Sequence, residues 1–249
     1  MVFDCYNERV KRMTDESQRI RLLEGIYMER IMIKKNLDDI VHERLLEDIF
    51  KGKFKPGEII SVEKICEQYT ISRTPVVQAI KGLYADGIVD VSATGKYYFP
   101  IADDSVVKEL MQTRLLFEKA SAMLIFENNY PVDVYEFCKY AEACAKYQEQ
   151  GDVYNASMYD LKLHWTLVNS ARNNYMAELY KRVQNKCLSV HYLNLNGAEV
   201  VSPGAVEGHR VMCEALKKWD RELLLSTIAN HIHFVENQIL DNIAHTNGH

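Results

Sequence analysis

Apolar residues recur with a helical period near 3.6 in three short segments of the first hundred residues. The first segment spans 37–50 and is followed by KGKFKPGE, whose glycines and proline end a helix. A second helix is expected over 62–69 and a third over 72–86, where Pro75 falls in the first turn and costs no hydrogen bond. Gly87 then ends the third helix. The pattern therefore predicts three consecutive short helices.

A β-hairpin is predicted directly after the third helix, in the segment IVDVSATGKYYFP. Two runs rich in β-forming residues flank Thr94-Gly95, a dipeptide typical of hairpin turns. Three helices followed by a hairpin predict a winged helix-turn-helix domain over residues 37–102. Residues 1–36 are polar and charged with a weak helical rhythm, so we expect an N-terminal extension that contains a helix.

The pattern changes at Asp104, after which β signals vanish and helical patterns alternate with short breakers. The expected helices span 104–127, 132–149, 153–171, 175–194, 204–218 and 221–244. The breakers include Gln150-Gly151-Asp152 and Trp219-Asp220. Residues 103–249 are therefore expected to form an all-α bundle, which makes the whole chain mainly α in fold class.

The composition fits two globular domains, because the chain has 249 residues of which 47% are hydrophobic. Acidic and basic residues balance at 16 each in residues 1–100, whereas residues 101–249 contain 19 acidic and 14 basic residues. The net charge of −5 argues against a protein that binds nucleic acid over its whole surface. A local basic face on the first domain is compatible with this charge.

Targeting signals are not evident in the sequence. It contains neither a run of 18 apolar residues nor a charged-then-apolar leader, so we expect no membrane span, no secretory signal and a cytoplasmic location. The six cysteines have scattered spacings without a CxxC pair. This arrangement favours free thiols in a reducing compartment over a disulfide framework.

The exposed face of the third predicted helix is the candidate DNA-binding surface, because a helix-turn-helix inserts the start of its second helix into the major groove. This face carries Arg73, Thr74, Val77, Gln78 and Lys81. Arg73 is the strongest candidate for a phosphate or guanine contact, and Lys96 lies near the hairpin tip. The periodicity alone fits equally well with an ordinary three-helix core that has a solvated basic face.

The segment PGEIISVEKICEQYTISRTPVVQAIKGLYADGIVDV, followed by Gly95, resembles the winged-helix domain of GntR-family transcriptional regulators over roughly residues 37–100. The resemblance implies that double-stranded operator DNA is the partner of this domain, with the helix face above and the hairpin residues Gly95 and Lys96 in contact with it. In that family an arginine usually follows the SRTPV core, and the preceding helix often carries another basic residue. This chain has Val77 and Glu63 at these places.

Val77 lies one helical turn from Arg73 and shares its face, so a small apolar surface replaces a charge-assisted contact. A valine can still touch a thymine methyl group. Two interpretations of Val77 remain open: a changed operator preference with weaker phosphate anchoring, or a partial loss of DNA binding.

A possible metal site is visible in the second part. In YDLKLHWTL, Asp160 and His164 are four residues apart and share one helix face. His209 and His231 lie 10 residues before and 11 residues after Trp219-Asp220, so an antiparallel helical hairpin would place both about 15 Å from its turn. Three imidazoles and a carboxylate suit a divalent transition metal. His191 and His233 are weaker candidates, since His233 is two residues from His231 and points elsewhere on the helix. The alternative is that each histidine is a satisfied core or surface residue.

The segments TRLLFEKASAML, DLKLHWTLVNSARNN and EGHRVMCEALKKWDRELLLSTIANHI resemble the effector-binding domain of FadR-type GntR regulators, known as FCD, over most of residues 104–245. The resemblance implies that Asp160, His164, His209 and His231 are metal ligands, with zinc, nickel, manganese and iron undistinguished. An acidic residue commonly precedes the third ligand in that family, whereas this chain has Gly208.

A small organic acid as effector would complete the metal shell with its carboxylate, and the resemblance implies that Arg114 is the cation that binds it. The alternative is an Arg114–Glu118 pair on a solvated helix face. Together these features predict a metabolite-responsive transcriptional regulator that is not an enzyme. The family resemblance and the symmetry of typical operators imply that it acts as a homodimer. A metalloenzyme and a ligand-binding protein that has lost its operator are the competing hypotheses.

Overall fold

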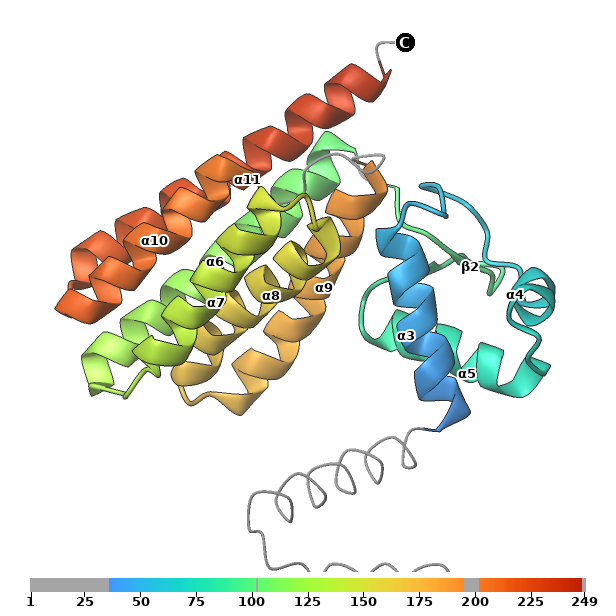
Figure 1. Cartoon of the computed structure of the whole chain (residues 1–249), viewed down its shortest axis with the longest axis horizontal. Helices are drawn as coiled ribbons and strands as arrows, with labels where there is room; N and C mark the ends of the chain where they lie inside the picture. The colour runs from blue at the N-terminus through green and yellow to red at the C-terminus, as the bar shows by residue number, and fades with distance from the viewer. Residues whose placement is uncertain (1–35, 102, 195–201, 248–249) are drawn as a thin grey trace, which may run out of the picture.

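The computed structural model describes residues 36–101, 103–194 and 202–247. A compact group of short helices with a β-hairpin lies beside a bundle of long helices (Figure 1). The predicted N-terminal extension lies outside the described residues, except for Asn36, the N-cap of the first described helix. The mainly α fold class predicted from the sequence is confirmed.

The smaller part contains the predicted helices and hairpin. Its elements are α3 (Leu37–Phe50), α4 (Val62–Tyr69), α5 (Arg73–Ala85), β1 (Asp90–Val91) and β2 (Tyr97–Tyr98). The strands pair antiparallel, with Asp90 opposite Tyr98 and Val91 opposite Tyr97. The Ser61 hydroxyl accepts a hydrogen bond from the Lys64 amide at 3.2 Å and so caps α4. This is a winged helix-turn-helix.

One apolar cluster holds these elements together. On α5, a stripe of Val76, Ala79, Ile80 and Leu83 at helical spacing is buried, and Tyr84 beside it is partly buried. It packs in one cluster with residues of α3 such as Leu45, and burial of each large apolar side chain contributes about 1.5–3 kcal/mol. The stripe fixes which face of α5 remains exposed.

The larger part is a helical bundle with its own apolar cluster. Its described helices are α6 (Asp104–Asn128), α7 (Val134–Glu149), α8 (Val153–Ser170), α9 (Asn174–Asn194), α10 (Pro203–Lys218) and α11 (Arg221–Asn247). Each limit lies within three residues of the predicted one. Trp219 has a left-handed φ of 52° at the turn between α10 and α11. The two helices run antiparallel, as predicted (Figure 1). The domain limits at residues 36/37 and 102/103 stay predictions.

Helix α9 joins the two parts. Its polar side chains contact the segment that follows α5: Asn185 Nδ2 to Asp86 O at 3.2 Å, Lys186 Nζ to Asp90 Oδ2 at 2.6 Å, and Ser189 Oγ to Ile88 O at 2.7 Å. Gly87 has a φ of +82°, and a Cβ there would lie 2.9 Å from Arg182 O. Glycine therefore allows both the turn and the close approach to α9.

The described residues contain no helix that combines the length and the apolar character needed to cross a bilayer. The described cysteines, Cys66, Cys138, Cys144, Cys187 and Cys213, are free, in agreement with the prediction of free thiols. Cys5 lies outside the described residues.

Candidate metal centre and DNA-binding face

The four predicted metal ligands come together in the interior of the bundle. Asp160 and His164 lie on α8, His209 on α10 and His231 on α11. One ligand atom from each side chain lies within 4.8 Å of all the others. The three imidazoles are at most 4% exposed, so the cluster is sealed from bulk water apart from the partly exposed Asp160.

The distances within the cluster suit a common central ion. Asp160 Oδ1 lies 3.1 Å from His209 Nε2 and 3.6 Å from His164 Nε2. The ring centroid of His231 lies 4.7 Å from that of His209 and 5.0 Å from that of His164. Counting residues from the α10–α11 turn predicted that His209 and His231 would be level, and their ring contact agrees with this prediction.

The ring nitrogens of the cluster lack hydrogen-bond partners in the part of the chain that the structure describes. This holds for His164 Nε2 and for both ring nitrogens of His209 and His231, since the 3.1 Å approach of His209 Nε2 to Asp160 Oδ1 lacks the geometry of a hydrogen bond. A buried polar atom without a partner costs about 1–3 kcal/mol, so such a cluster would be expensive as a purely structural core. A metal ion would bind one nitrogen of each imidazole, and the donor set of three imidazoles and one carboxylate suits a divalent transition metal. The cluster could therefore hold a metal ion whose identity the geometry does not fix.

The protonation states of three of the four candidate ligands also favour a metal. Burial lowers the pKa of His209, and burial together with the neighbouring histidines lowers that of His231 well below its ordinary value. Burial would raise the pKa of Asp160, but His164 and His209 outweigh it and hold that pKa well below its ordinary value. Asp160, His209 and His231 are therefore held in the deprotonated forms that metal ligation requires. His164 differs, because burial would lower its pKa but Glu118 and Asp160 outweigh burial and raise it, so a metal must displace a proton from this ring.

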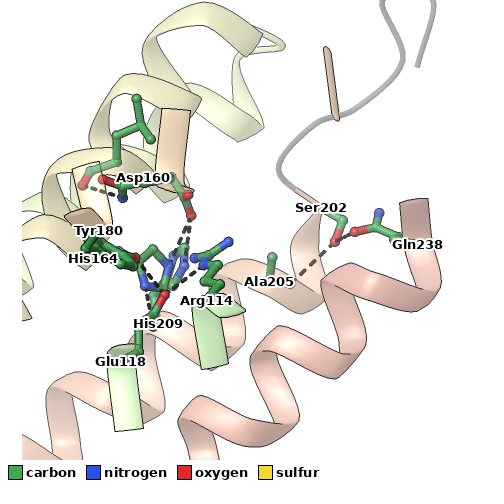
Figure 2. Close-up of polar contacts among 11 residues, drawn as sticks. Arg114, Glu118, Asp160, His164, Tyr180, Ser202, Ala205, His209 and Gln238 are labelled. Atoms are coloured by element: carbon green, nitrogen blue, oxygen red, sulfur yellow. Dashed lines mark hydrogen bonds and ion pairs between the residues drawn. The ribbon is translucent and has the colours of Figure 1, made fainter. Parts of the chain in front are cut away.

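Glu118 on α6 orients His164. Its Oε2 lies 2.9 Å from His164 Nδ1, while its Oε1 accepts hydrogen bonds from Arg114 Nε at 2.7 Å and Tyr180 OH at 2.8 Å (Figure 2). Burial raises the pKa of Glu118, but His164 and Arg114 outweigh it and lower that pKa, so the carboxylate is ionised. An ionised carboxylate accepts the Nδ1 hydrogen and leaves Nε2, which faces Asp160, for a metal.

Gly208 lies directly against the cluster. A Cβ at this position would come within 2.8 Å of His231 Nδ1 and 3.3 Å of His231 Cβ. An acidic side chain, which the family resemblance leads one to expect here, would displace the imidazole of His231. Gly208, which departs from the family pattern, therefore allows α10 to pack closely against α11.

A small cavity of about 30 Å³ adjoins the cluster on the side of Arg114 and Asp160. Its polar lining residues are Arg114, Ser157, Asp160, Gln184 and His191. Arg114 and Glu118 do form the predicted pair, but both are buried rather than solvated. Among the described residues, no partner contacts Arg114 Nη2 or His191 Nε2, although both atoms are buried. Burial lowers the pKa of His191 to about 4, so this imidazole is neutral near pH 7.

The sequence argument missed Glu118 and Tyr180 as parts of this site, and it ranked His191 below the four predicted ligands. A signal existed for Glu118, because Arg114 and Glu118 continue the stripe of buried positions that includes Met111 at helical spacing. That stripe places the pair in the core. For Tyr180 and His191, periodicity shows that they lie inward, but not what they face.

The candidate DNA-contacting residues lie on the outer side of the smaller part. Arg73 begins α5, and the predicted face is exposed at Arg73, Thr74, Gln78 and Lys81 and partly exposed at Val77. Gly95 and Lys96 are exposed in the turn between β1 and β2. The structure thus brings these residues to the surface of the helix-turn-helix and its wing.

Arg73 has a partner that the sequence did not reveal. Its Nη1 donates to Oε1 of Glu63, which lies in the first turn of α4. Ser61 Oγ lies 3.5 Å from the other carboxylate oxygen of Glu63. The hydrogen bond from Arg73 is the main cause that lowers the pKa of Glu63. The two unexpected features of this region, an acidic residue in α4 and a lone arginine on α5, are therefore physically connected.

Two family models match the chain. The model described as the FCD domain matches residues 109–234, about half of the chain. The model described as bacterial regulatory proteins, gntR family, matches residues 37–95.

Similar proteins carry the same kind of description. The HTH-type transcriptional regulator YdhC of Bacillus subtilis (strain 168) is 23% identical over 194 residues, which cover 76% of this chain and 85% of that protein. The gluconate operon transcriptional repressor of Bacillus licheniformis is 20% identical over 220 residues, which cover 87% of this chain and 90% of that protein.

Solved structures support the fold. E. coli McbR/YncC has a TM-score of 0.67 at 20% identity, covering 83% of this chain and 98% of that chain. A GntR transcriptional regulator from Rhodococcus sp. RHA1 has a TM-score of 0.68 at 20% identity, covering 82% of this chain and 97% of that chain. At these identities the likeness establishes the fold alone.

Proposed function

Because the chain belongs to the GntR family of transcriptional regulators and carries an FCD domain after its DNA-binding domain, we propose that it is a metabolite-responsive regulator. In this proposal the bundle holds one divalent metal ion and a small carboxylate effector, and effector binding changes the affinity for operator DNA. The relatives are transcriptional regulators, which disfavours the hypothesis of a metalloenzyme.

The observation that carries the proposal is the convergence of unpartnered imidazole nitrogens on the carboxylate of Asp160. A metal bound by Asp160, His164, His209 and His231 would supply a Lewis-acidic position for an oxygen ligand. Glu118 would keep the Nδ1 hydrogen on His164, so that the opposite nitrogen stays free for ligation.

The charges around the cavity favour an anion with a single charge. Arg114 is positive, its pKa being held well above the ordinary value, whereas Glu118 and Asp160 are negative. With a divalent metal and neutral histidines, these buried charges leave an excess of one positive charge. A monocarboxylate would neutralise it, whereas a dicarboxylate would bring a further charge into a site of low polarity.

Arg114 and His191 offer the remaining polar contacts. Both residues line the cavity, and Arg114 Nη2 and His191 Nε2 are buried without a hydrogen-bond partner among the described residues. Arg114 is suited to a carboxylate oxygen, and the neutral imidazole of His191 can donate to or accept from a hydroxyl or carbonyl. The best candidates are therefore short monocarboxylates that carry one further oxygen.

The size of the cavity provides the link to DNA binding. A volume of about 30 Å³ admits one or two water molecules, so an organic acid must push the surrounding helices apart. Gln184 and His191, which line the cavity, lie on α9. The same helix binds the backbone of Asp86 and Ile88 after the recognition helix. Movement of α9 would therefore shift the winged domain.

Exposed apolar side chains support a homodimer. Leu116 on α6 is 71% exposed and Leu179 on α9 is 61% exposed, and these two helices pack against each other. Burial of this face in a second copy would remove apolar surface from water. Leu116→Glu should then convert a dimer into monomers in analytical ultracentrifugation, and an unchanged dimer would place the interface elsewhere.

The metal is tested by mass-spectrometric metal analysis of the purified chain, of His209→Ala and His231→Ala, and of His233→Ala as a matched control. His233 lies two residues from His231 on α11 but its side chain is 60% exposed. We expect about one metal per chain in wild type and His233→Ala, and loss in both cluster variants. No metal in the wild type, even after incubation with zinc, nickel or manganese, would refute the four-ligand site.

The effector is tested on the metal-loaded chain with a panel of acids: acetate, lactate, pyruvate, malonate, citrate and gluconate. Thermal stabilisation should be larger for short monocarboxylates than for malonate or citrate, and should require the metal and Arg114. If Arg114→Gln responds like the wild type, the effector does not bind at this cavity. Gluconate is included because the name of the Bacillus licheniformis relative refers to its operon.

A further inference from the structure

The ion pair between Glu63 and Arg73 joins the beginnings of the two helices of the helix-turn-helix. Glu63 lies in the first turn of α4, and Arg73 is the first residue of α5. Both side chains are 66% exposed, so the pair lies on the surface. Exposed ion pairs contribute little to stability, so this pair adds little to the stability of the fold.

The pair changes what Arg73 can do on DNA. A guanidinium already balanced by a carboxylate gains little from a phosphate, and the carboxylate itself is repelled by the DNA backbone. Base edges in the major groove do not carry this penalty. With Nη1 bound to Glu63, the remaining N–H groups of Arg73 are still donors of the kind that pair with the O6 and N7 acceptors of guanine.

Glu63 can make a base contact of its own. One carboxylate oxygen accepts from Arg73, the Ser61 hydroxyl lies 3.5 Å from the other, and the backbone amide of Glu63 also donates to the carboxylate. The two oxygens together still have a lone pair for one further donor. Among the bases, the amino group of cytosine is the usual donor to a glutamate. Val77, one turn along α5 from Arg73, adds an apolar surface rather than a charge.

We propose that Glu63 is a specificity-determining residue that positions Arg73 for guanine and itself accepts a hydrogen bond from a neighbouring cytosine. The inference rests on DNA binding by the winged domain and is independent of the metal and effector. It assigns Glu63 and Val77 to a changed operator preference with few phosphate contacts, rather than to a loss of DNA binding.

The test compares the full-length wild type, Glu63→Gln and Arg73→Ala with the double variant, by enrichment from a random-sequence duplex pool. Glu207→Gln is the matched control, because it breaks an exposed Glu–Arg pair of the bundle with the same change in charge. The wild type and the control should enrich the same sequence with a G·C preference. Glu63→Gln should lose roughly 5- to 150-fold of the discrimination at that base pair.

Salt dependence provides the second measurement, made by fluorescence anisotropy on a random-sequence duplex. Freeing Arg73 for a phosphate should steepen the slope of log K against log salt by about 0.9 for each bound winged domain in Glu63→Gln. In the Arg73→Ala background, Glu63→Gln should no longer steepen the slope. If Glu63→Gln steepened the salt slope by the same amount in the Arg73→Ala background, the role of Glu63 in positioning Arg73 would be refuted.

Other outcomes overturn the proposal in different ways. Equal enrichment and equal slopes in the wild type and Glu63→Gln would make the pair irrelevant to recognition. Salt-dependent binding of the wild type without any enriched sequence would also make the pair irrelevant to recognition, although the domain would still bind DNA. A failure of the metal or acid experiments would refute the proposed effector site without affecting these measurements.

Discussion

Replacing Glu118 by glutamine should weaken metal binding at the histidine cluster although Glu118 is not a ligand. In the structure, Oε1 of Glu118 accepts from Arg114 and Tyr180, and Oε2 faces Nδ1 of His164. A glutamine has one acceptor oxygen and one NH₂ donor. The oxygen should remain with the donors of Arg114 and Tyr180, which leaves the NH₂ group against His164 Nδ1.

This replacement reverses the tautomer of His164. An NH₂ group opposite Nδ1 favours a ring whose hydrogen lies on Nε2, the nitrogen that approaches Asp160 at 3.6 Å. A protonated Nε2 cannot bind a metal. Loss of such an orienting carboxylate typically weakens metal affinity about 10- to 100-fold, or about 1.4–2.7 kcal/mol.

The variant should also be less stable without metal. Glu118 is fully buried and balances the buried Arg114 guanidinium. Removing one partner of a buried ion pair costs about 3–5 kcal/mol, because the other charge is left uncompensated. Thermal melting of the apoprotein measures this loss, and far-UV circular dichroism identifies a temperature at which the variant is folded.

Competition with a chromophoric chelator then gives the metal dissociation constant at that temperature. Tyr180→Phe is the control, since it removes one hydrogen bond to Glu118 but leaves the Glu118–His164 contact. It should cost about 1 kcal/mol of stability and leave the dissociation constant within a few-fold of the wild type. A folded Glu118→Gln that binds zinc or nickel as tightly as the wild type would refute the argument from the His164 tautomer.

Two glycine substitutions provide further tests. Gly208→Ala would usually stabilise a helix by about 0.5–1 kcal/mol, but here the new Cβ would lie 2.8 Å from His231 Nδ1, so we expect a lower melting temperature and weaker metal binding. A higher melting temperature with unchanged metal affinity would contradict this packing. Gly87→Ala combines a φ of +82° with a contact of 2.9 Å to Arg182 O, so it should destabilise the chain more than Gly95→Ala, which has a φ of +78° and open space around it. Equal losses in melting temperature would show that the contact with α9 is unimportant.

The helices themselves are readable from the sequence. Amphipathic periodicity and breakers act over a few residues, so the limits of α3 and α4 agree with prediction. The positions of His209 and His231 also follow from local geometry, because both are counted from one turn along two helices of constant rise.

The environment of a residue is a different matter. The spacing of Arg114 and Glu118 predicts their pairing whether the helix face is solvated or buried. Packing of α6 against α8 and α9 buries this ion pair, and its carboxylate then orients His164. The Glu63–Arg73 pair likewise depends on how α4 and α5 cross. The sequence therefore left both the function of Glu118 and the partner of Arg73 undetermined.

The sequence by itself determined the order and limits of the helices, the winged hairpin and the four residues that converge as candidate ligands. The tertiary structure decided which side chains surround the four candidate ligands and how the two parts of the chain are joined. Glu118 and His164 are 46 residues apart, and Ser189 and Ile88 are 101 residues apart. Periodicity describes neighbours three and four residues away, whereas these contacts depend on the packing of helices that are distant along the chain.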